Sequence, residues 1–269
     1  DKLKTITGFD GSFGIAIILK KKNFLFVDGR YVEQAKIQAG KKFKILEIPK
    51  KLPYQVLNPR LNLGFDPMVF TSRSLIYFFR NKIKLTPITK ILVNSDNLKD
   101  FTLRKFYSLS PKIVGETVNS KIKRLVQILN KDRSDHIFIS APENVAWLLN
   151  IRGRDNPFSP IPNCRIIINT KGEVNFFSKI KKSSNIFKKK CFLRISFYRE
   201  NQIESFLSRL KAKKIIIDKN SCPVLLENLI SSKFKISKIG DPLYLMKSIK
   251  NKVEINKTIE SHVYDGVAV

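Results

Sequence analysis

Two short apolar runs near the start of the chain are separated by four polar residues. The runs are Ile15–Leu19 and Phe24–Val27, and the polar connection is Lys20–Asn23. Apolar runs of this length around a short polar turn are typical of a β-hairpin with at least one buried face. Glycines at positions 8, 11, 14 and 29 occur where the chain enters and leaves the hairpin, as expected where φ is unusual or two backbones approach closely.

Beyond the hairpin, the apolar pattern alternates between helical spacing and short extended runs. We expect helices over 31–39, 72–79, 118–129, 142–149, 203–210 and 224–230, strands over 43–48, 61–65, 83–88, 136–140, 191–195, 215–217 and 234–239, and a second hairpin over 165–168 and 174–177. Alternating strands and helices predict an α/β fold. Because the two hairpins occupy equivalent places, the second half is interpreted as a repeat of the first.

The length of 269 residues predicts about two domains. The polar segment Ser108–Thr117, which contains Pro111 and Gly115, is the expected linker. A second junction is expected near Gly240–Pro242, followed by a helix that carries Ile255, Ile259, His262, Val263 and Gly266 on one face. The predicted domains are therefore 1–110, which is expected to be truncated at its start, 111–242 and 243–269.

The formal net charge of +29 raises the question of a nucleic-acid partner. The lysines, however, are scattered in short groups at predicted turns, and no aromatic residues alternate with them in a stacking pattern. We therefore interpret the positive charge as a solvated basic face and predict that nucleic acid is not a partner. No apolar run approaches the ~20 residues of a membrane span, so no membrane partner is expected.

Three cysteines, Cys164, Cys191 and Cys222, lack the spacing of metal ligands. His136 and His262 are the only imidazoles, so a structural zinc site is not expected within this chain. Buried free thiols are the simpler interpretation, and they fit a reducing, cytoplasmic location.

Four peptides carry a resemblance to a known family. They are TGFDGSFG at Thr7–Gly14, VDGRY at Val27–Tyr31, AWLLNIRGRD at Ala146–Asp155, and the segment Lys250–Gly266. In order and pattern they resemble the non-catalytic N-terminal half of a three-domain Xaa-Pro aminopeptidase (aminopeptidase P). The resemblance implies two tandem creatinase N-terminal-like domains, each a mixed sheet flanked by helices. The first helix of the catalytic pita-bread domain would follow them.

The resemblance also implies an activity, that of a metalloprotease. Enzymes of this family are hydrolases that release an N-terminal residue preceding proline, and they use a divalent metal pair, commonly manganese. The metal ligands belong to the domain that starts near Lys250, and the chain stops before any of them. We therefore expect no catalytic and no metal-binding residue here, and an inactive fragment that gates and scaffolds the active site. The implied partners are a peptide with proline at its second position and, for the full-length protein, a second copy in a homodimer.

Arg30 is the expected substrate-binding residue, because the matching arginine of the family's DGRY peptide lies near bound peptide. The alternative is an internal ion pair of Arg30 with Asp28 or Asp10 that fixes the corner after the hairpin. Arg152, Arg154 and Asp155 are expected in a proline-rich loop that forms a wall of the substrate entrance; a brace at a domain junction is the alternative.

Two other functions stay open at this point. One is a non-catalytic relative that keeps the fold as a peptide- or protein-binding module. The other is a hydrolase of the creatinase or prolidase type on the same architecture.

Overall fold

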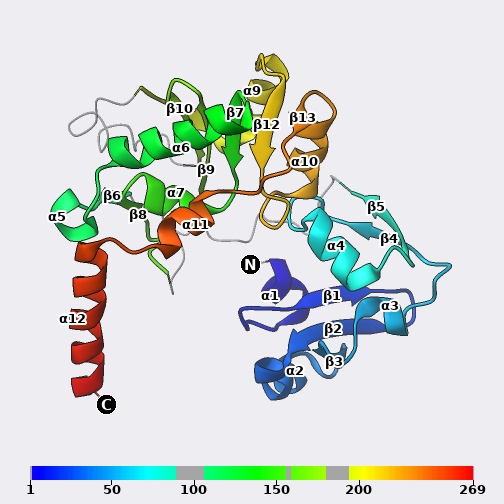
Figure 1. The fold of residues 1–269 in the computed structure, drawn as a ribbon. Coiled ribbons are helices and arrows are strands. Elements are labelled where there is room, and N and C mark those ends of the chain that lie inside the picture. Colours follow the sequence, from blue (N-terminus) through cyan, green and yellow to red (C-terminus); the bar gives the residue numbers. More distant parts are fainter. Residues whose placement is uncertain (1, 89–105, 156–158, 180–193, 269) are drawn as a thin grey trace. The chain divides into compact units, whose positions relative to one another are not determined.

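The computed structural model describes residues 2–88, 106–155, 159–179 and 194–268 (Figure 1). The chain divides into two compact units, an N-terminal unit of residues 1–99 and a C-terminal unit of residues 100–269. The domain boundaries expected at residues 110 and 242 stay predictions.

The N-terminal unit contains two small sheets. Its elements are α1 (Lys2–Thr7), β1 (Ile15–Ile18), β2 (Asn23–Asp28), a 3₁₀ turn (Gly29–Tyr31), α2 (Val32–Ala39), β3 (Lys44–Ile48), α3 (Pro53–Val56), β4 (Asn62–Phe65), α4 (Ser72–Phe79) and β5 (Lys84–Pro87). Strand β2 pairs antiparallel with β1 and parallel with β3, and β4 pairs parallel with β5. The first sheet is therefore mixed, and the first hairpin is confirmed.

Side chains on the two faces of the first sheet enter two apolar clusters. Ile15 and Ile17 pack with Phe78 of α4 in one cluster, which also takes in half-buried side chains of β4 and β5. Leu25 and Val27 pack against α2 in the other cluster. Alternate residues of a strand point to opposite faces, so this sheet is covered on both sides.

Helix α4 begins and ends where its sequence predicts. The Thr71 hydroxyl accepts a hydrogen bond from the Ser74 backbone nitrogen at 3.1 Å, and the Ser74 hydroxyl accepts one from the Thr71 nitrogen at 3.0 Å. These two bonds satisfy donors that the first turn of a helix leaves without intrahelical partners. Arg80 ends the helix in the left-handed region, with φ of 50°.

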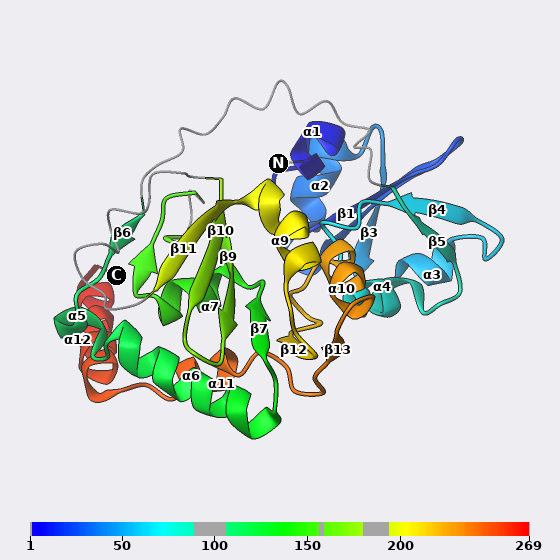
Figure 2. The same ribbon diagram turned by 90° about the horizontal axis from the view of Figure 1, so that it is seen from above.

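The C-terminal unit is built on a six-stranded mixed sheet. Its elements are β6 (Tyr107–Ser108), α5 (Pro111–Val114), α6 (Val118–Asp132), β7 (His136–Ile139), α7 (Pro142–Leu148), β8 (Ile151–Arg152), β9 (Cys164–Asn169), β10 (Val174–Ser178), β11 (Ile195–Arg199), a 3₁₀ turn (Glu200–Gln202), α9 (Ile203–Arg209), β12 (Lys214–Ile217), α10 (Val224–Ser231), β13 (Lys235–Ile236), α11 (Leu243–Ser248) and α12 (Lys252–Ala268). The strand order is β11-β10-β9-β7-β12-β13 (Figure 2).

Helices cover both faces of this sheet. Ile137 and Ile139 of β7 pack into the cluster that contains the apolar residues of α6 and α7. On the other face, the Phe177 ring of β10 packs edge-on against Phe206 of α9, with 5.3 Å between centroids. A strand that is buried on both faces has a continuous apolar sequence, which explains the Ile-rich peptides of β9 and β12.

Most predicted elements are confirmed within one or two residues, including the hairpin of β9 and β10. The strand expected over 191–195 is shifted: β11 runs from Ile195 to Arg199, and 191–193 lie outside the described residues. The expected linker Ser108–Thr117 contains regular secondary structure. Ser108 belongs to β6, which pairs with β8, and Pro111 and Gly115 start and end α5. Proline at the first helical position and glycine after the last are helix boundary signals as well as turn signals.

Helix α12 also differs from expectation. His262 is exposed, whereas the sequence places it in apolar packing, and α12 buries no side chain in this structure.

Across the described part of the chain, no helix is both long enough and apolar enough to span a membrane.

Candidate functional site

Arg30 lies in the 3₁₀ turn that directly follows β2. The Asp28 side chain caps this turn, because its Oδ1 atom accepts a hydrogen bond from the Arg30 backbone nitrogen at 3.0 Å. The cap fixes the corner between the hairpin and α2. The guanidinium of Arg30 stacks over the Tyr31 ring, 5.1 Å from its centroid, and the Tyr31 hydroxyl lies 2.7 Å from the Ser12 hydroxyl.

The guanidinium of Arg30 makes a two-pronged ion pair with Asp28. Nε lies 3.1 Å from Oδ1 and Nη2 lies 2.7 Å from Oδ2. The hydrogen bonds from Arg30 lower the pKa of Asp28, and the same bonds raise the pKa of Arg30. The Arg30 side chain is nevertheless 74% exposed, and Asp28 occupies two of its five N–H donors.

The pairing with Asp28 is one of the two internal contacts that the sequence left open. Asp10, the other candidate, instead accepts hydrogen bonds from Gln34 and Gln38 at 2.8 Å and pairs with Lys4 at 3.2 Å. These bonds, with that from Gln38 foremost, lower the pKa of Asp10. A contact of Arg30 with peptide stays a prediction.

The other three predicted site residues lie after α7: Arg152 ends β8, and Arg154 and Asp155 lie in the loop that follows it. Arg152 is half-buried and turned toward the chain that precedes it, because Nη1 donates to the carbonyl oxygens of Ile151 at 2.8 Å and Ala146 at 3.3 Å. Burial lowers the pKa of Arg152. Its guanidinium therefore braces the end of α7.

Arg154 and Asp155 lie further along the same loop. Asp155 Oδ2 accepts a hydrogen bond from the Asn163 backbone nitrogen at 2.6 Å, while Arg154 is exposed. A second bond, from the Gly153 nitrogen to the Pro160 carbonyl at 3.0 Å, closes the loop onto itself. Arg152 is therefore held by the preceding backbone, whereas Arg154 is exposed. Residues 156–158 of the proline-rich stretch lie outside the described residues, and the entrance role of the loop stays a prediction.

A buried lysine is the polar group that the sequence analysis missed. Lys121 of α6 is 1% exposed, and its Nζ donates to the Trp147 carbonyl at 2.8 Å and to Asn150 Oδ1 at 2.7 Å. The ammonium also lies 4.0 Å from the centroid of the Trp147 ring. Burial lowers the pKa of Lys121 to about 8. The sequence does contain a signal for the burial of Lys121. This residue is three positions after Val118 and four before Leu125, which places it on the apolar face of the helix.

This lysine belongs to a network that reaches the start of α12. Trp147 Nε1 donates to Glu254 Oε1 at 3.2 Å, and Glu254 Oε2 accepts from the Asn251 backbone nitrogen at 2.9 Å. Asn251 Nδ2 donates to the Val114 carbonyl of α5 at 2.8 Å. Trp147 is half-buried, and its indole lies between the lysine and the glutamate.

Of the other histidine and cysteine side chains in the C-terminal unit, His136 is half-buried, and Cys164 and Cys222 are buried. Burial lowers the pKa of His136, raises that of Cys164, and raises that of Cys222 to about 12. Both thiols are free, and Cys191 lies outside the described residues. Among the described residues, no group of three or more His, Cys, Asp or Glu side chains is placed to hold a metal ion.

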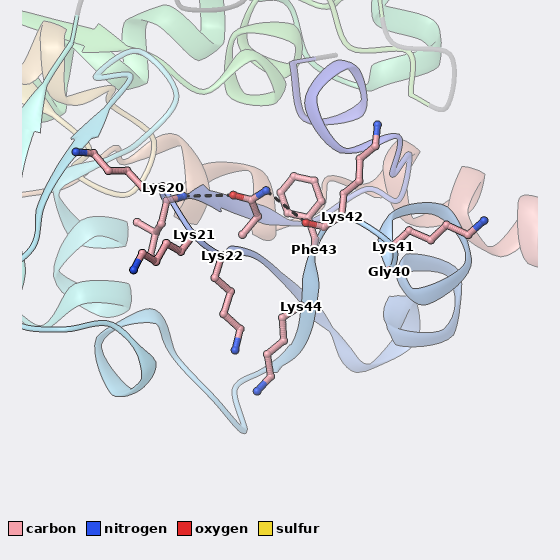
Figure 3. Close-up of a pocket in the computed structure, with 10 residues that line it drawn as sticks. Lys20, Lys21, Lys22, Gly40, Lys41, Lys42, Phe43 and Lys44 are labelled. Atoms are coloured by element: carbon pink, nitrogen blue, oxygen red, sulfur yellow. Dashed lines mark hydrogen bonds between the residues drawn. The ribbon is translucent and has the colours of Figure 1, made fainter.

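A shallow, lysine-lined pocket of about 450 Å³ opens on the N-terminal unit (Figure 3). It lies between the β1–β2 turn and the segment before β3, which Asn23 connects through its bond to the Lys42 carbonyl at 3.4 Å. Six lysines line it: Lys20, Lys21, Lys22, Lys41, Lys42 and Lys44. Phe43 is 5% exposed and so offers no free ring face for a base to stack on.

Both units match known family models. Residues 4–95 match the creatinase/prolidase N-terminal domain, and residues 99–254 match a second model with the same description. The chain is 31% identical to the probable Xaa-Pro aminopeptidase P of Laccaria bicolor over 173 residues, which are 58% of this chain and 26% of that protein. It is 26% identical to Xaa-Pro aminopeptidase 1 of Dictyostelium discoideum over 249 residues, 84% of this chain and 39% of that one.

Among solved structures, the fold resembles that of an X-prolyl aminopeptidase from Caenorhabditis elegans, described as a cytosolic enzyme with a di-nuclear active site. The TM-score is 0.79 at 20% identity, over 95% of this chain and 45% of that chain. The chain thus spans less than half the length of these relatives. The chain belongs to the creatinase/prolidase N-terminal domain family, whose domain it contains twice, and it matches the N-terminal portion of Xaa-Pro aminopeptidases.

Proposed function

We propose that this chain is the non-catalytic N-terminal portion of a cytoplasmic Xaa-Pro aminopeptidase. The complete enzyme would release the residue that precedes proline at a peptide's N-terminus, and the two units described here would scaffold and gate its active site. Proline fixes φ and has no N–H, so the bond before it resists general peptidases. The observation that carries the proposal is the pair of family matches, together with the likeness to Xaa-Pro aminopeptidases over most of the chain.

The proposal assigns α12 to the boundary with a catalytic domain. The start of this helix is tied to the C-terminal unit through Asn251 and Glu254. Its remaining turns expose Ile255, Ile259 and Val263, which recur every four residues, with exposed fractions of 45%, 60% and 60%. An apolar stripe at helical spacing predicts packing against a further structural element. A catalytic domain that continues from α12 would cover this stripe.

The described residues do not fit the metal pair of the proposed enzyme, which is expected to be manganese. Two divalent ions that activate water need several carboxylate and imidazole ligands close together. The described residues contain no such group. We therefore assign the metal ligands to the catalytic domain and give the described residues no step in bond cleavage.

The roles proposed for this portion are binding and access. Arg30 would contact the peptide with the N–H donors that Asp28 leaves available. The loop of Arg152, Arg154 and Asp155 would form a wall of the entrance, and its internal bonds would keep that wall rigid. A homodimer of the complete protein is part of the same proposal.

The test compares the complete gene product with residues 1–269 alone. Each is incubated with Mn²⁺ and a tripeptide that carries proline at its second position, and release of the first residue is measured. Cleavage by the complete protein and none by residues 1–269 is the expected result. Cleavage of dipeptides only, or of creatine, would indicate the prolidase or creatinase alternative. Peptide binding without any cleavage would indicate the binding-module alternative.

A further inference from the structure

The lysine-lined pocket of the N-terminal unit forms because two parallel strands start at the same edge of a sheet. Strand β2 pairs parallel with β3, and Phe24 lies opposite Lys44 at the start of this ladder. The segments that lead into the two strands therefore meet at one end of the sheet. Lys20–Lys22 lead into β2, and Lys41 and Lys42 precede Lys44 at the start of β3. The fold thus brings together two lysine clusters that lie about twenty residues apart in the sequence.

Hydrogen bonds hold the backbone of both segments in place. Asn23 Oδ1 accepts a hydrogen bond from the Leu19 nitrogen at 3.3 Å, and Asn23 Nδ2 donates to the Lys42 carbonyl at 3.4 Å. In the second segment, the nitrogens of Lys42 and Phe43 both donate to the Ala39 carbonyl at 3.0 Å, and the Phe43 ring is buried. The backbone positions of the lysines are therefore set by the fold, while all six lysine side chains are exposed.

The positive charges of this pocket are not neutralised by neighbours. The residues that line it include no carboxylate, and its six lysines form no ion pair with any described residue. Elsewhere in the same unit, Lys50 pairs with Glu47 at 2.7 Å. The six ammonium groups are spread around the two segments, with Lys22 and Lys44 extending in the same direction (Figure 3). Like charges gathered around one hollow create a positive potential that attracts an anion.

The shape and chemistry of the pocket favour clustered phosphates over other anions. Its volume of about 450 Å³ falls within the roughly 300–1,000 Å³ that is usual for small-molecule sites. Lysine binds phosphate as a point charge on a flexible stem, so ammonium groups from both segments can turn toward one anion. Each phosphate carries more charge and more acceptor oxygens than a carboxylate of an acidic peptide does. A nucleobase would add nothing, because Phe43 is buried.

We propose that the lysine-lined pocket binds a compact anion that carries several phosphate groups. The anion would lie between the two segments and contact lysines of both, which would relieve the repulsion among the six ammonium groups. A free polyphosphate and the headgroup of a phosphoinositide lipid present this same chemistry, and the experiment below distinguishes them. The inference concerns the N-terminal unit alone and is independent of the proposed function.

The test measures binding of inorganic tripolyphosphate to residues 1–269 by calorimetry at low and moderate salt. We expect binding that weakens as salt rises, because the lysines are exposed. The double variant Lys21→Glu with Lys42→Glu reverses one charge in each segment and should weaken binding at least about tenfold. The control Lys51→Glu with Lys84→Glu makes the same change in net charge at exposed positions outside the pocket and should keep the affinity within about threefold.

Circular dichroism checks that both double variants are folded, and Lys21→Gln with Lys42→Gln, which should give a smaller loss, replaces the first pair if it is not. Equal losses in the pocket pair and the control pair would show diffuse attraction to the whole surface and overturn the proposal. Absence of tripolyphosphate binding at low salt, together with absence of vesicle binding in the arm below, would overturn it as well.

Two further arms identify the anion. A glutamate peptide of the same net charge as tripolyphosphate should bind at least about tenfold more weakly, and equal binding would overturn the preference for phosphate. Sedimentation with phosphatidylcholine vesicles that contain a phosphoinositide tests the lipid source. Sedimentation of the wild type that is lost in the Lys21 and Lys42 variant would assign the site to a lipid headgroup. Tripolyphosphate binding without sedimentation would assign it to a free polyphosphate.

Discussion

The ammonium of Lys121 lies 4.0 Å from the centroid of the Trp147 ring and donates a hydrogen bond to the carbonyl oxygen of the same tryptophan. Through this pair, α6 is fixed to the end of α7, and the indole continues the contact to Glu254 of α12. Three segments that are distant in sequence therefore depend on one buried charge. This arrangement makes the stability of the C-terminal unit dependent on pH.

The first prediction concerns Lys121. Burial lowers its pKa to about 8 in the folded state, against about 10.4 in an unfolded chain. Between these values the unfolded state binds more protons, so the free energy of unfolding rises with pH in this window. The Lys121 contribution should increase by on the order of 2–3 kcal/mol from pH 7 to pH 10.5. Lys121→Met should lose this increase.

The measurement is urea unfolding followed by the fluorescence of Trp147, the only tryptophan of the chain. The difference in unfolding free energy between wild type and Lys121→Met removes the contribution of the other lysines. Lys123→Met, at an exposed position of α6, is the control and should keep the wild-type pH dependence. An identical pH dependence in wild type and Lys121→Met would show that the buried lysine keeps its ordinary pKa.

The second prediction concerns Arg30. Its pair with Asp28 is exposed, and exposed pairs contribute little to stability. Arg30→Ala in the complete protein should therefore raise KM for longer peptides while leaving the melting temperature close to that of the control Lys36→Ala, which removes another exposed pair. A fall in melting temperature with unchanged kinetics would assign Arg30 to the structure of the corner alone.

The third prediction concerns Gly153 in the loop after α7. A Cβ atom at this position would lie 2.7 Å from the backbone of Pro162. Gly153→Ala should destabilise the C-terminal unit by about 1–3 kcal/mol, because the loop must open to accept the methyl group. Thermal unfolding monitored by tryptophan fluorescence measures the change. Gly266→Ala, where nothing lies within 4 Å, should be neutral or slightly stabilising; equal effects would contradict the close approach.

The fourth prediction concerns the attachment of α12. Asn251 Oδ1 accepts from the backbone nitrogens of Val253 and Glu254 at 3.0 Å, and Nδ2 reaches the Val114 carbonyl. Asn251→Ala should cost about 1–2 kcal/mol of helix stability and speed hydrogen exchange in the first turn of α12. Asn256→Ala, at an exposed position of the same helix, should change exchange little. Indistinguishable exchange in the two variants would show that Asn251 does not cap the helix.

The fifth prediction concerns the lysine-lined pocket. Its six lysines are surface point charges without an exposed aromatic platform, so we expect only weak, salt-sensitive attraction for nucleic acid. Filter binding with DNA at low and moderate salt should detect no sub-micromolar affinity. Tight binding that is lost in a variant with Lys21 and Lys42 changed to Glu, but kept with Lys211 and Lys213 changed, would establish a nucleic-acid site here.

Local signals in the sequence were sufficient for most elements of the fold. The apolar runs around Lys20–Asn23 determined the first hairpin, and Thr71 determined the start of α4. Both depend on contacts between residues a few positions apart, which a linear pattern records directly. The family peptides likewise identified the two related domains, because such motifs are read along the chain.

Contacts between distant residues were decided only by the tertiary structure. The linker expected at Ser108–Thr117 is folded because β6 pairs with β8, more than forty residues away. Similarly, Lys121 is buried because Trp147 and Asn150 close over it, and Arg152 turns inward to the end of α7. The sequence determined which segments form helices and strands, since those depend on neighbours. The tertiary structure decided which polar groups lose water and which partners replace it, since burial depends on every element packed around a residue.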